Sequence, residues 1–334
     1  MKAVRVPKEK AEEVRKYAEK IGAKDKTRLI VRKGEFVEIP IYDDFIDHFK
    51  EYEIIEQKNP VFSRPKNITD ALKRIIPHDL LRFAPKRYKI IGDIIIIKIH
   101  EKLEKYKFKI GEALLDLHPH CKSVWRDFGK EGMIRKPKVE CIAGSGSETI
   151  HRENKCLFKL DVTKVMYSLG NQAERARMAR IVKDGEVVVD MFAGIGYFSI
   201  PIAVHSNAEK IYSIEINPDA FDYLIENIKI NCVDNIVPIL GDCMFAAPEG
   251  VADRVIMGHI RCHDFIKKAM TVLDKEGVIH YHESVPEPVM ERPIIRLKKN
   301  AELLNKNIKI LSYRKVKNYS PGVYHVVVDA YVYT

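Results

Sequence analysis

The sequence predicts an α/β protein whose C-terminal half is a doubly wound, mostly parallel sheet, preceded by two smaller α/β domains. From about residue 158, strand-like apolar runs alternate with helical periods. The last two apolar runs are joined by only residues 318–322, a link too short for a parallel crossover, so they favour an antiparallel hairpin. The chain has 334 residues, 46% hydrophobic and 31% charged, which is enough for two or three folded domains.

The composition also narrows the class of protein. No run approaches the roughly 20 apolar residues of a membrane-spanning helix, and residues 1–10 carry charges where a secretory signal would be apolar. We therefore expect a cytoplasmic location and no membrane partner. The six cysteines are scattered without a Cys-x-x-Cys pair, which is typical of reduced thiols. The net charge of +10 favours a nucleic-acid partner, although a solubilising surface explains it equally well.

The first 87 residues predict a cap and a linker. Residues 1–57 form a small α/β cap, with an amphipathic helix over 11–21 and strands near 28–32 and 36–40. Residues 58–87 form a basic linker, in which prolines break the periodicity and one helix spans 68–83.

Residues 88–156 predict a second α/β domain. Its opening run over 90–99 is so dense in β-branched residues that it favours one buried strand. The elements that follow are a helix over 107–117, a loop rich in lysine and glycine over 126–137, and strands at 139–143 and 148–152.

Residues 157–334 hold the large sheet. Its parallel strands are predicted at 187–191, 210–214, 236–240, 254–257 and 278–282, with helices between them. The terminal hairpin pairs residues 308–316 with 323–332.

The strongest local motif follows the first of these strands. The strand ends in Asp190 and leads through Phe192 to Gly194 and Gly196, before a helix begins. Glycines let the backbone approach a ligand closely, and the start of a helix offers free N–H groups. These glycines alone are weak evidence of a binding site, because any tight turn can contain them.

The next two strands end in acidic residues as well. Glu215, followed by Ile216, lies where a carboxylate binds a ribose diol in dinucleotide folds. Asp242, followed by Cys243, could accept a hydrogen bond from an adenine amino group. Because parallel strands end at the same edge of a sheet, the three acids predict a nucleoside pocket there.

The glycine turn, the later acids and the terminal hairpin resemble the class I S-adenosylmethionine-dependent methyltransferase fold. The tract over 158–171, with Glu174, Arg175 and Arg177, resembles more specifically the archaeal and eukaryotic enzymes that modify position 37 of tRNA. These enzymes comprise guanine-37 N1-methyltransferases and the wybutosine-synthesis aminocarboxypropyltransferases. The resemblance covers about residues 88–334 and implies S-adenosylmethionine as the group donor and tRNA as the substrate.

Two features favour the aminocarboxypropyl branch. The methyltransferase branch ends its fourth strand in Asn-Leu-Pro, whereas this chain has Met257, Gly258 and His259 there. The tracts 168–171 and 278–283 also resemble the aminocarboxypropyl branch more closely. This branch implies transfer of the 3-amino-3-carboxypropyl group to 4-demethylwyosine at position 37 of tRNA(Phe), with release of methylthioadenosine.

Two alternatives stay open. One is a guanine-37 N1-methyltransferase, with methylation of the wyosine precursor as a second activity, because the N-terminal cap resembles the extra domain of that branch. The other is a non-catalytic tRNA-binding protein that keeps a cofactor pocket for stability.

The resemblance also implies residue roles. It places Ser168 and Arg175 at the methionine end of the cofactor, and an arginine suits a carboxylate because its fork binds two oxygens. Glu174 resembles the general base of the methyltransferase branch, and Arg152 its charge-stabilising partner. Without the resemblance, Glu174 and Arg177 predict an exposed i, i+3 ion pair.

Histidines and basic residues complete the expected site. His259 and His282 are expected to line the pocket for the base, and since no spacing matches a zinc signature we expect no metal. Trp125 favours a core role over stacking on a base. We expect a monomer that holds the anticodon arm of tRNA through phosphate contacts. The basic residues concerned are Lys66, Lys73, Arg74, Arg82, Lys86, Arg87, Lys89, Arg126, Lys130, Arg135, Lys136 and Lys138.

Overall fold

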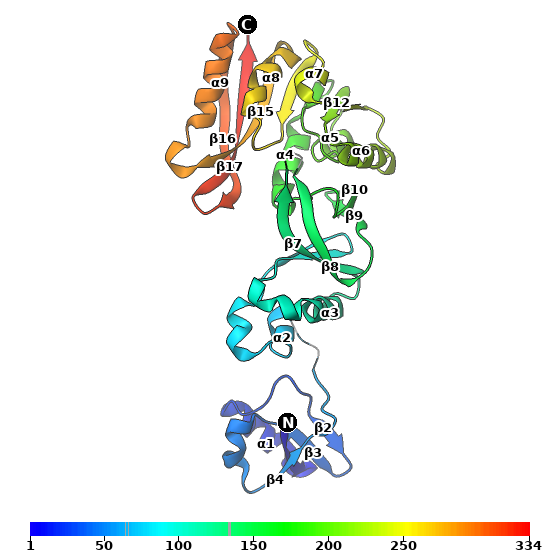
Figure 1. Ribbon diagram of the computed structural model, residues 1–334, viewed down its shortest axis with the longest axis vertical. Helices are drawn as coiled ribbons and strands as arrows, with labels where there is room; N and C mark the ends of the chain where they lie inside the picture. Colours follow the sequence, from blue (N-terminus) through cyan, green and yellow to red (C-terminus); the bar gives the residue numbers. More distant parts are fainter. Residues whose placement is uncertain (64, 66, 133–134) are drawn as a thin grey trace. The chain divides into compact units, whose positions relative to one another are not determined.

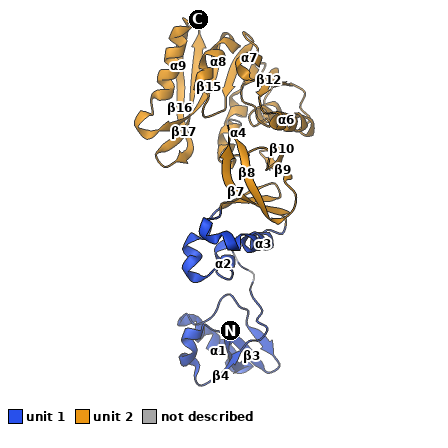
Figure 2. Ribbon diagram, viewed as in Figure 1, with its two compact units in different colours: residues 1–87, 99–119 blue, residues 88–98, 120–334 orange. Residues whose placement is uncertain are grey.

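A computed structural model of the chain describes residues 1–63, 65, 67–132 and 135–334 (Figure 1). The chain forms two compact units: Met1–Arg87 with Ile99–Pro119, and Tyr88–Lys98 with His120–Thr334 (Figure 2). The predicted domain boundaries at residues 57, 87 and 156 stay predictions. Lys66, predicted to contact tRNA, lies outside the described residues.

The first unit begins with a four-stranded antiparallel sheet in the order β2-β3-β1-β4. Its elements are β1 (Lys2–Pro7), α1 (Lys8–Lys20), β2 (Val31–Lys33), β3 (Phe36–Pro40) and β4 (Glu53–Glu56). Apolar residues from β1, α1 and β3, among them Val4, Val14 and Ile39, form its core. Later in the unit, α2 (Ile68–Leu72) contacts α3 (Lys107–Leu117). The predicted helix over 68–83 is therefore only partly right, because a second, 3-10 helix occupies His78–Phe83.

The second unit opens with a small sheet that corrects two predictions. The run over 90–99 is not one strand: β5 (Tyr88–Ile91) and β6 (Ile94–Ile97) pair antiparallel around Gly92, whose φ of 56° allows the tight turn. The predicted loop over 126–137 instead lies largely within β7 (Ser123–Glu131) and β8 (Lys136–Gly144), an antiparallel pair. The pairing of β7 with β8 stabilises strands in this segment, although its high lysine and glycine content favours a loop. A separate ribbon joins β9 (Glu148–Glu153) to β10 (Cys156–Asp161).

The large sheet has the order β13-β12-β11-β14-β15-β17-β16. Its strands are β11 (Val187–Asp190), β12 (Lys210–Glu215), β13 (Ile236–Leu240), β14 (Ala252–Met257), β15 (Leu273–Pro286), β16 (Asn307–Ser320) and β17 (Val323–Tyr333). The first five are parallel, and the terminal hairpin is antiparallel, as predicted. The order reverses between β11 and β14, which is where α/β sheets bind ligands.

Helices cover both faces of this sheet: α8 and α9 lie beside one another on one face, as Figure 1 shows, and α4, α5 and α6 pack on the other. The helices are α4 (Gln172–Ile181), α5 (Ser199–His205), α6 (Pro218–Ile230), α7 (Cys243–Ala246), α8 (Ile266–Val272) and α9 (Arg292–Leu303). Neighbouring residues of one strand serve opposite cores: Val188 packs with the α4–α6 side, and Val189 with the α8–α9 side. A strand buried on both faces needs a continuous apolar sequence, which explains the run Val187–Val189.

No helix within the described ranges is long and apolar enough to cross a membrane. All six cysteines are free thiols. Trp125 is half-buried against the α4–α6 core, and its indole N–H donates to the Ser123 hydroxyl at 3.0 Å.

Asn227 of α6 ties the glycine turn to the ribbon. Its fully buried amide accepts from the Lys159 N–H at 2.7 Å and donates to the carbonyls of Lys159 at 3.2 Å and Ile195 at 2.9 Å. These bonds hold β10 and the turn against the same helix.

Replacing Asn227 by leucine should lower the free energy of unfolding by about 2–4 kcal/mol, because it strands buried backbone groups without partners. Urea denaturation followed by circular dichroism measures the loss. Glu226→Ala, one residue away and half-exposed in an ion pair with Lys159, is the control and should cost less than about 1 kcal/mol. Equal effects of the two changes would contradict this role for Asn227.

Candidate functional site

The glycine turn is shaped by its own side chains. Gly194 and Gly196 have φ of 57° and 93°, which favour glycine. A Cβ on Gly194 would lie 2.3 Å from the Tyr197 ring, and one on Gly196 would lie 2.6 Å from Ile200. The glycines therefore serve the turn itself, in addition to any approach of a ligand.

Asp190 holds this turn from beneath. Its fully buried carboxylate accepts from the Ser199 hydroxyl at 2.8 Å and from the Phe192 N–H at 3.3 Å. Burial raises the pKa of Asp190 to about 7. The structure thus gives Asp190 a supporting position, and its predicted contact with the cofactor stays a prediction.

Glu215 and Asp242 lie at the ends of β12 and β13, as predicted. Glu215 accepts from the backbone N–H groups of Gly194 at 2.7 Å and Asn217 at 2.8 Å, and its half-buried carboxylate keeps lone pairs for a further donor. Asp242 caps α7 by accepting from the Met244 N–H at 2.9 Å. Burial raises the pKa of the Cys243 thiol to about 12, and the negative charges of Asp242, Glu215 and Asp190 contribute to the increase.

Apolar groups flank the acids. Ile216 is 49% exposed beside Glu215, where it offers a face to an adenine ring. Phe192 is half-buried; its ring centroid lies 5.7 Å from that of His259 and 5.2 Å from that of Phe265. Carboxylates beside an apolar face match the two parts of a nucleoside.

Arg175 is not available in the way that we predicted. Its guanidinium is 1% exposed and binds both oxygens of Glu153, at 2.7 and 2.6 Å, while also donating to the Ser168 carbonyl at 3.0 Å. It therefore fixes the backbone before α4, and its predicted contact with the cofactor stays a prediction.

Lys317 of β16 supplies the free cation that Arg175 does not. Its ammonium donates to the Ser168 hydroxyl at 2.7 Å, and no described carboxylate lies within ion-pair distance of it. Burial, and then Arg175, Lys89 and Arg135, lower the pKa of Lys317 to about 8. Nearby, the buried side-chain oxygen of Asn171 has no hydrogen-bond partner among the described residues. An unpaired cation beside an unused acceptor fits the carboxylate and ammonium of an amino acid.

Sequence reasoning missed both groups. Lys317 is one of many lysines, and only the pairing of the terminal hairpin brings it to Ser168. Lys130 is one of the cations near Lys317. Burial and then Arg135 lower the pKa of Lys130 to about 8, and Lys317 contributes to the decrease. Arg135, predicted only as a phosphate contact, also contributes to the lowered pKa of His259 and of His325.

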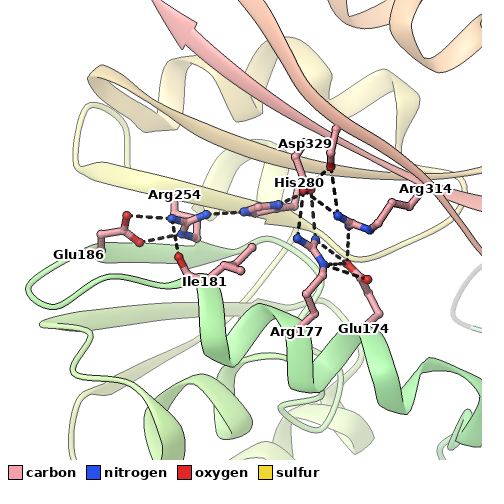
Figure 3. Close-up of polar contacts among 9 residues, drawn as sticks. Glu174, Arg177, Ile181, Glu186, Arg254, His280, Arg314 and Asp329 are labelled. Atoms are coloured by element: carbon pink, nitrogen blue, oxygen red, sulfur yellow. Dashed lines mark hydrogen bonds and ion pairs between the residues drawn. The ribbon is translucent and has the colours of Figure 1, made fainter.

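Glu174 lies in a buried network of charges (Figure 3). It binds the guanidinium of Arg177 at 2.7 Å and that of Arg314 at 3.2 Å. Both arginines also bind Asp329, at 3.0 and 3.1 Å, and His280 lies 2.6 Å from the same carboxylate. These contacts and Ser312 hold the pKa of Asp329 well below its usual range despite its burial.

The network corrects one prediction and leaves another unsupported. The ion pair of Glu174 with Arg177 exists, but Glu174 is 5% exposed, so the expectation of an exposed pair is wrong. Tertiary contacts with Arg314 of β16 and Asp329 of β17 bury it. Arg152 is exposed on β9 and lines a surface groove with Gly92 and Lys159, and none of its described contacts involves Glu174.

Of the two predicted base-pocket histidines, His259 lies just after the end of β14, and His282 lies within β15. Burial and Arg135 lower the pKa of His259 to about 4. His282 is fully buried, and its Nδ1 lies 3.0 Å from Nε2 of His325. Within the described part of the chain, no three His, Cys, Asp or Glu side chains are grouped as metal ligands.

The geometry fits S-adenosylmethionine, with carboxylates for the ribose, an apolar face for the adenine, and a cation with an acceptor for the amino-acid end. Comparisons with known proteins agree. Residues 149–311 match the TRM5/TYW2 methyltransferase domain, 68–147 the TYW2 N-terminal domain, and 3–50 the tRNA methyltransferase 5 N-terminal domain.

Two relatives illustrate the two branches. The tRNA(Phe) (4-demethylwyosine(37)-C(7)) aminocarboxypropyltransferase of Methanocaldococcus jannaschii is 48% identical over 249 residues, 73% of this chain and 97% of that protein. The tRNA (guanine(37)-N(1))-methyltransferase Trm5b of Pyrococcus abyssi is 39% identical over 334 residues, 98% of each chain.

Among solved structures, Pyrococcus horikoshii TYW2 in complex with MeSAdo matches with a TM-score of 0.71 and 39% identity, covering 80% of this chain and 98% of that one. The chain therefore belongs to the TRM5/TYW2 family of S-adenosylmethionine-dependent tRNA-modifying transferases.

Proposed function

We propose that this enzyme transfers the 3-amino-3-carboxypropyl group of S-adenosylmethionine to C7 of 4-demethylwyosine at position 37 of tRNA(Phe), releasing methylthioadenosine. The observation that carries the choice of branch is the end of β14. A Cβ on Gly258 would lie 2.7 Å from the Phe198 ring, so the asparagine that the methyltransferase branch places at this strand end would require this ring to move. The 48% identity to an enzyme of this name supports the same choice.

The reaction depends on which carbon of the sulfonium meets the nucleophile. A sulfonium has three electrophilic carbons, and the carbon held in line with the nucleophile at roughly 3–3.5 Å reacts. We propose that Glu215 binds the ribose while Lys317 and Asn171 hold the carboxylate and the ammonium. Fixing both ends of the donor turns the four-carbon arm, rather than the methyl group, toward the base.

The proposal also covers how the enzyme holds tRNA, its oligomeric state and its location. We propose that the basic residues of β7 and β8 contact the anticodon arm, that base 37 leaves its stack to reach the site, and that the enzyme acts as a cytoplasmic monomer. Arg126 and Lys138 lie on these strands, and Arg135 lies just before β8.

A guanine-37 N1-methyltransferase is the second candidate. The match of residues 3–50 to the tRNA methyltransferase 5 N-terminal domain favours it, as does the near-complete coverage of Trm5b. An unmodified tRNA transcript with guanine at position 37 is the substrate that distinguishes the candidates.

Labelled donors test the proposed reaction. With tRNA bearing 4-demethylwyosine, S-adenosylmethionine labelled in its carboxyl carbon should transfer label to tRNA. Methyl-labelled donor should leave its label in methylthioadenosine, because the methyl group stays on sulfur. Chromatography of tRNA and nucleoside products measures both. Methyl label in tRNA without methylthioadenosine would refute the assignment.

Replacing Glu215 by alanine should weaken binding of S-adenosylmethionine by roughly 10–150-fold, because a charged acceptor for the ribose is lost. Isothermal titration calorimetry measures the change. Glu209→Ala, an exposed acid just before β12, is the matched control and should bind the donor as wild type does. Unchanged affinity in the Glu215 variant would contradict the ribose site.

Replacing Lys317 by alanine should weaken binding of S-adenosylmethionine by roughly tenfold or more while leaving methylthioadenosine unaffected, since only the former carries the carboxylate. Lys315→Ala, an exposed lysine on the same strand, is the control. Equal loss for both ligands would show that the Lys317 change damages the fold instead of the carboxylate contact.

A further inference from the structure

We propose that His282 and His325, joined by a hydrogen bond, form the proton acceptor that removes the hydrogen of the substrate carbon after the aminocarboxypropyl group has been attached. The inference rests on the proposed function, because attack by a ring carbon leaves a proton that has to depart.

The pair has unused hydrogen-bonding capacity. His282 and His325 are 0% and 1% exposed, and their facing nitrogens lie 3.0 Å apart. The outer nitrogens, Nε2 of His282 and Nδ1 of His325, are buried and have no partner among the described residues. Buried polar atoms in proteins are nearly always hydrogen-bonded, so two unbonded nitrogens on a pair of bonded histidines point to a missing ligand or a chemical role.

The tautomers of the pair give it one free acceptor at all times. If His282 donates to His325, its Nε2 is the bare nitrogen and His325 carries N–H at Nδ1; if His325 donates, the reverse holds. Burial lowers the pKa of both rings, that of His325 to about 4, with Lys317 and Arg135 contributing. Both rings are therefore neutral near pH 7, with an acceptor ready.

The pair lies at the edge where parallel strands end. β14 ends at Met257, opposite Tyr281, so His282 is the first residue of β15 beyond that end. The His282 ring lies 5.4 Å from that of Phe198, which in turn packs on Gly258. On the other side, His325 is the cross-strand partner of Lys317, the cation next to Ser168. The pair thus lies between the end of β14 and the proposed amino-acid end of the donor.

Other acceptors nearby are occupied. Glu174 and Asp329 each bind Arg177 and Arg314 (Figure 3). Both nitrogens of His280 are used, one by Asp329 and one by the Arg254 guanidinium, each at 2.6 Å. Arginine-bound carboxylates are poor bases because proton uptake would break the ion pairs. Among the described side chains near the pair, His259 is a further candidate, and the experiment includes it.

The chemical step balances without another reactant. C7 forms a bond to the γ-carbon of the arm, and the carbon–sulfur bond breaks with its electron pair returning to sulfur, which becomes neutral methylthioadenosine. The C7–H bond then breaks, its electron pair restores the aromatic ring, and the proton passes to the bare imidazole nitrogen. A shift along the hydrogen bond moves positive charge away from the base.

The test measures single-turnover rates with 4-demethylwyosine tRNA carrying hydrogen or deuterium at C7. His282→Gln and His325→Gln keep polar groups of similar size but cannot take up a proton, and His325→Ala is a further variant. We expect rates roughly 10²-fold below wild type. We also expect a larger deuterium isotope effect than in wild type, because proton removal becomes rate-limiting. Affinity for S-adenosylmethionine should stay unchanged and show that the site is folded; His78→Ala, an exposed histidine of the first unit, is the control.

Three results would overturn the proposal: unchanged rates in all variants, slower rates without an increased isotope effect, or an increased isotope effect in His259→Ala alone. Any variant that loses affinity for the donor is set aside, and the substitutions that keep this affinity, at either histidine of the pair, decide. Failure of the proposed function is separate, because it appears in wild type as methyl label on tRNA.

Discussion

The buried charges around Glu174 and Asp329 are the interaction on which the site depends. They join α4 to two strands of the terminal hairpin through Arg177 and Arg314, and they reach β14 and β11 through His280, Arg254 and Glu186. Breaking a buried ion pair by removing one partner costs about 3–5 kcal/mol, because a charge is left uncompensated. The network therefore fixes α4, and with it the turn that presents Ser168, against the sheet.

The side chains at the cofactor edge of the sheet are also held by hydrogen bonds within the fold. Glu215 and Asp242 accept hydrogen bonds from backbone N–H groups of nearby turns. These bonds orient the carboxylates before a ligand binds. Arg175 binds Glu153 and the Ser168 carbonyl. Among the described residues, Lys317 lacks a carboxylate partner and the side-chain oxygen of Asn171 lacks any hydrogen-bond partner, which is why we propose them for the amino-acid end.

The branch of the family follows from packing as much as from polar groups. Phe198 fills the space beside Gly258, so the end of β14 offers the ring of His259 instead of an amide. The full-length match to Trm5b shows that the N-terminal part of the chain is shared with the methyltransferase branch, whereas the site is argued from the catalytic half.

The sequence by itself determined the large sheet, its hairpin and the positions of Glu215 and Asp242, because apolar periodicity and strand-end acids are local signals. It misjudged residues 90–99 and 126–137, where the turn at Gly92 and the pairing of β7 with β8 outweighed composition. Only the tertiary structure decided that Arg175 is occupied, that Glu174 is buried, and that Lys317 and His325 reach the site. These contacts join residues far apart in the chain, and no local pattern specifies them.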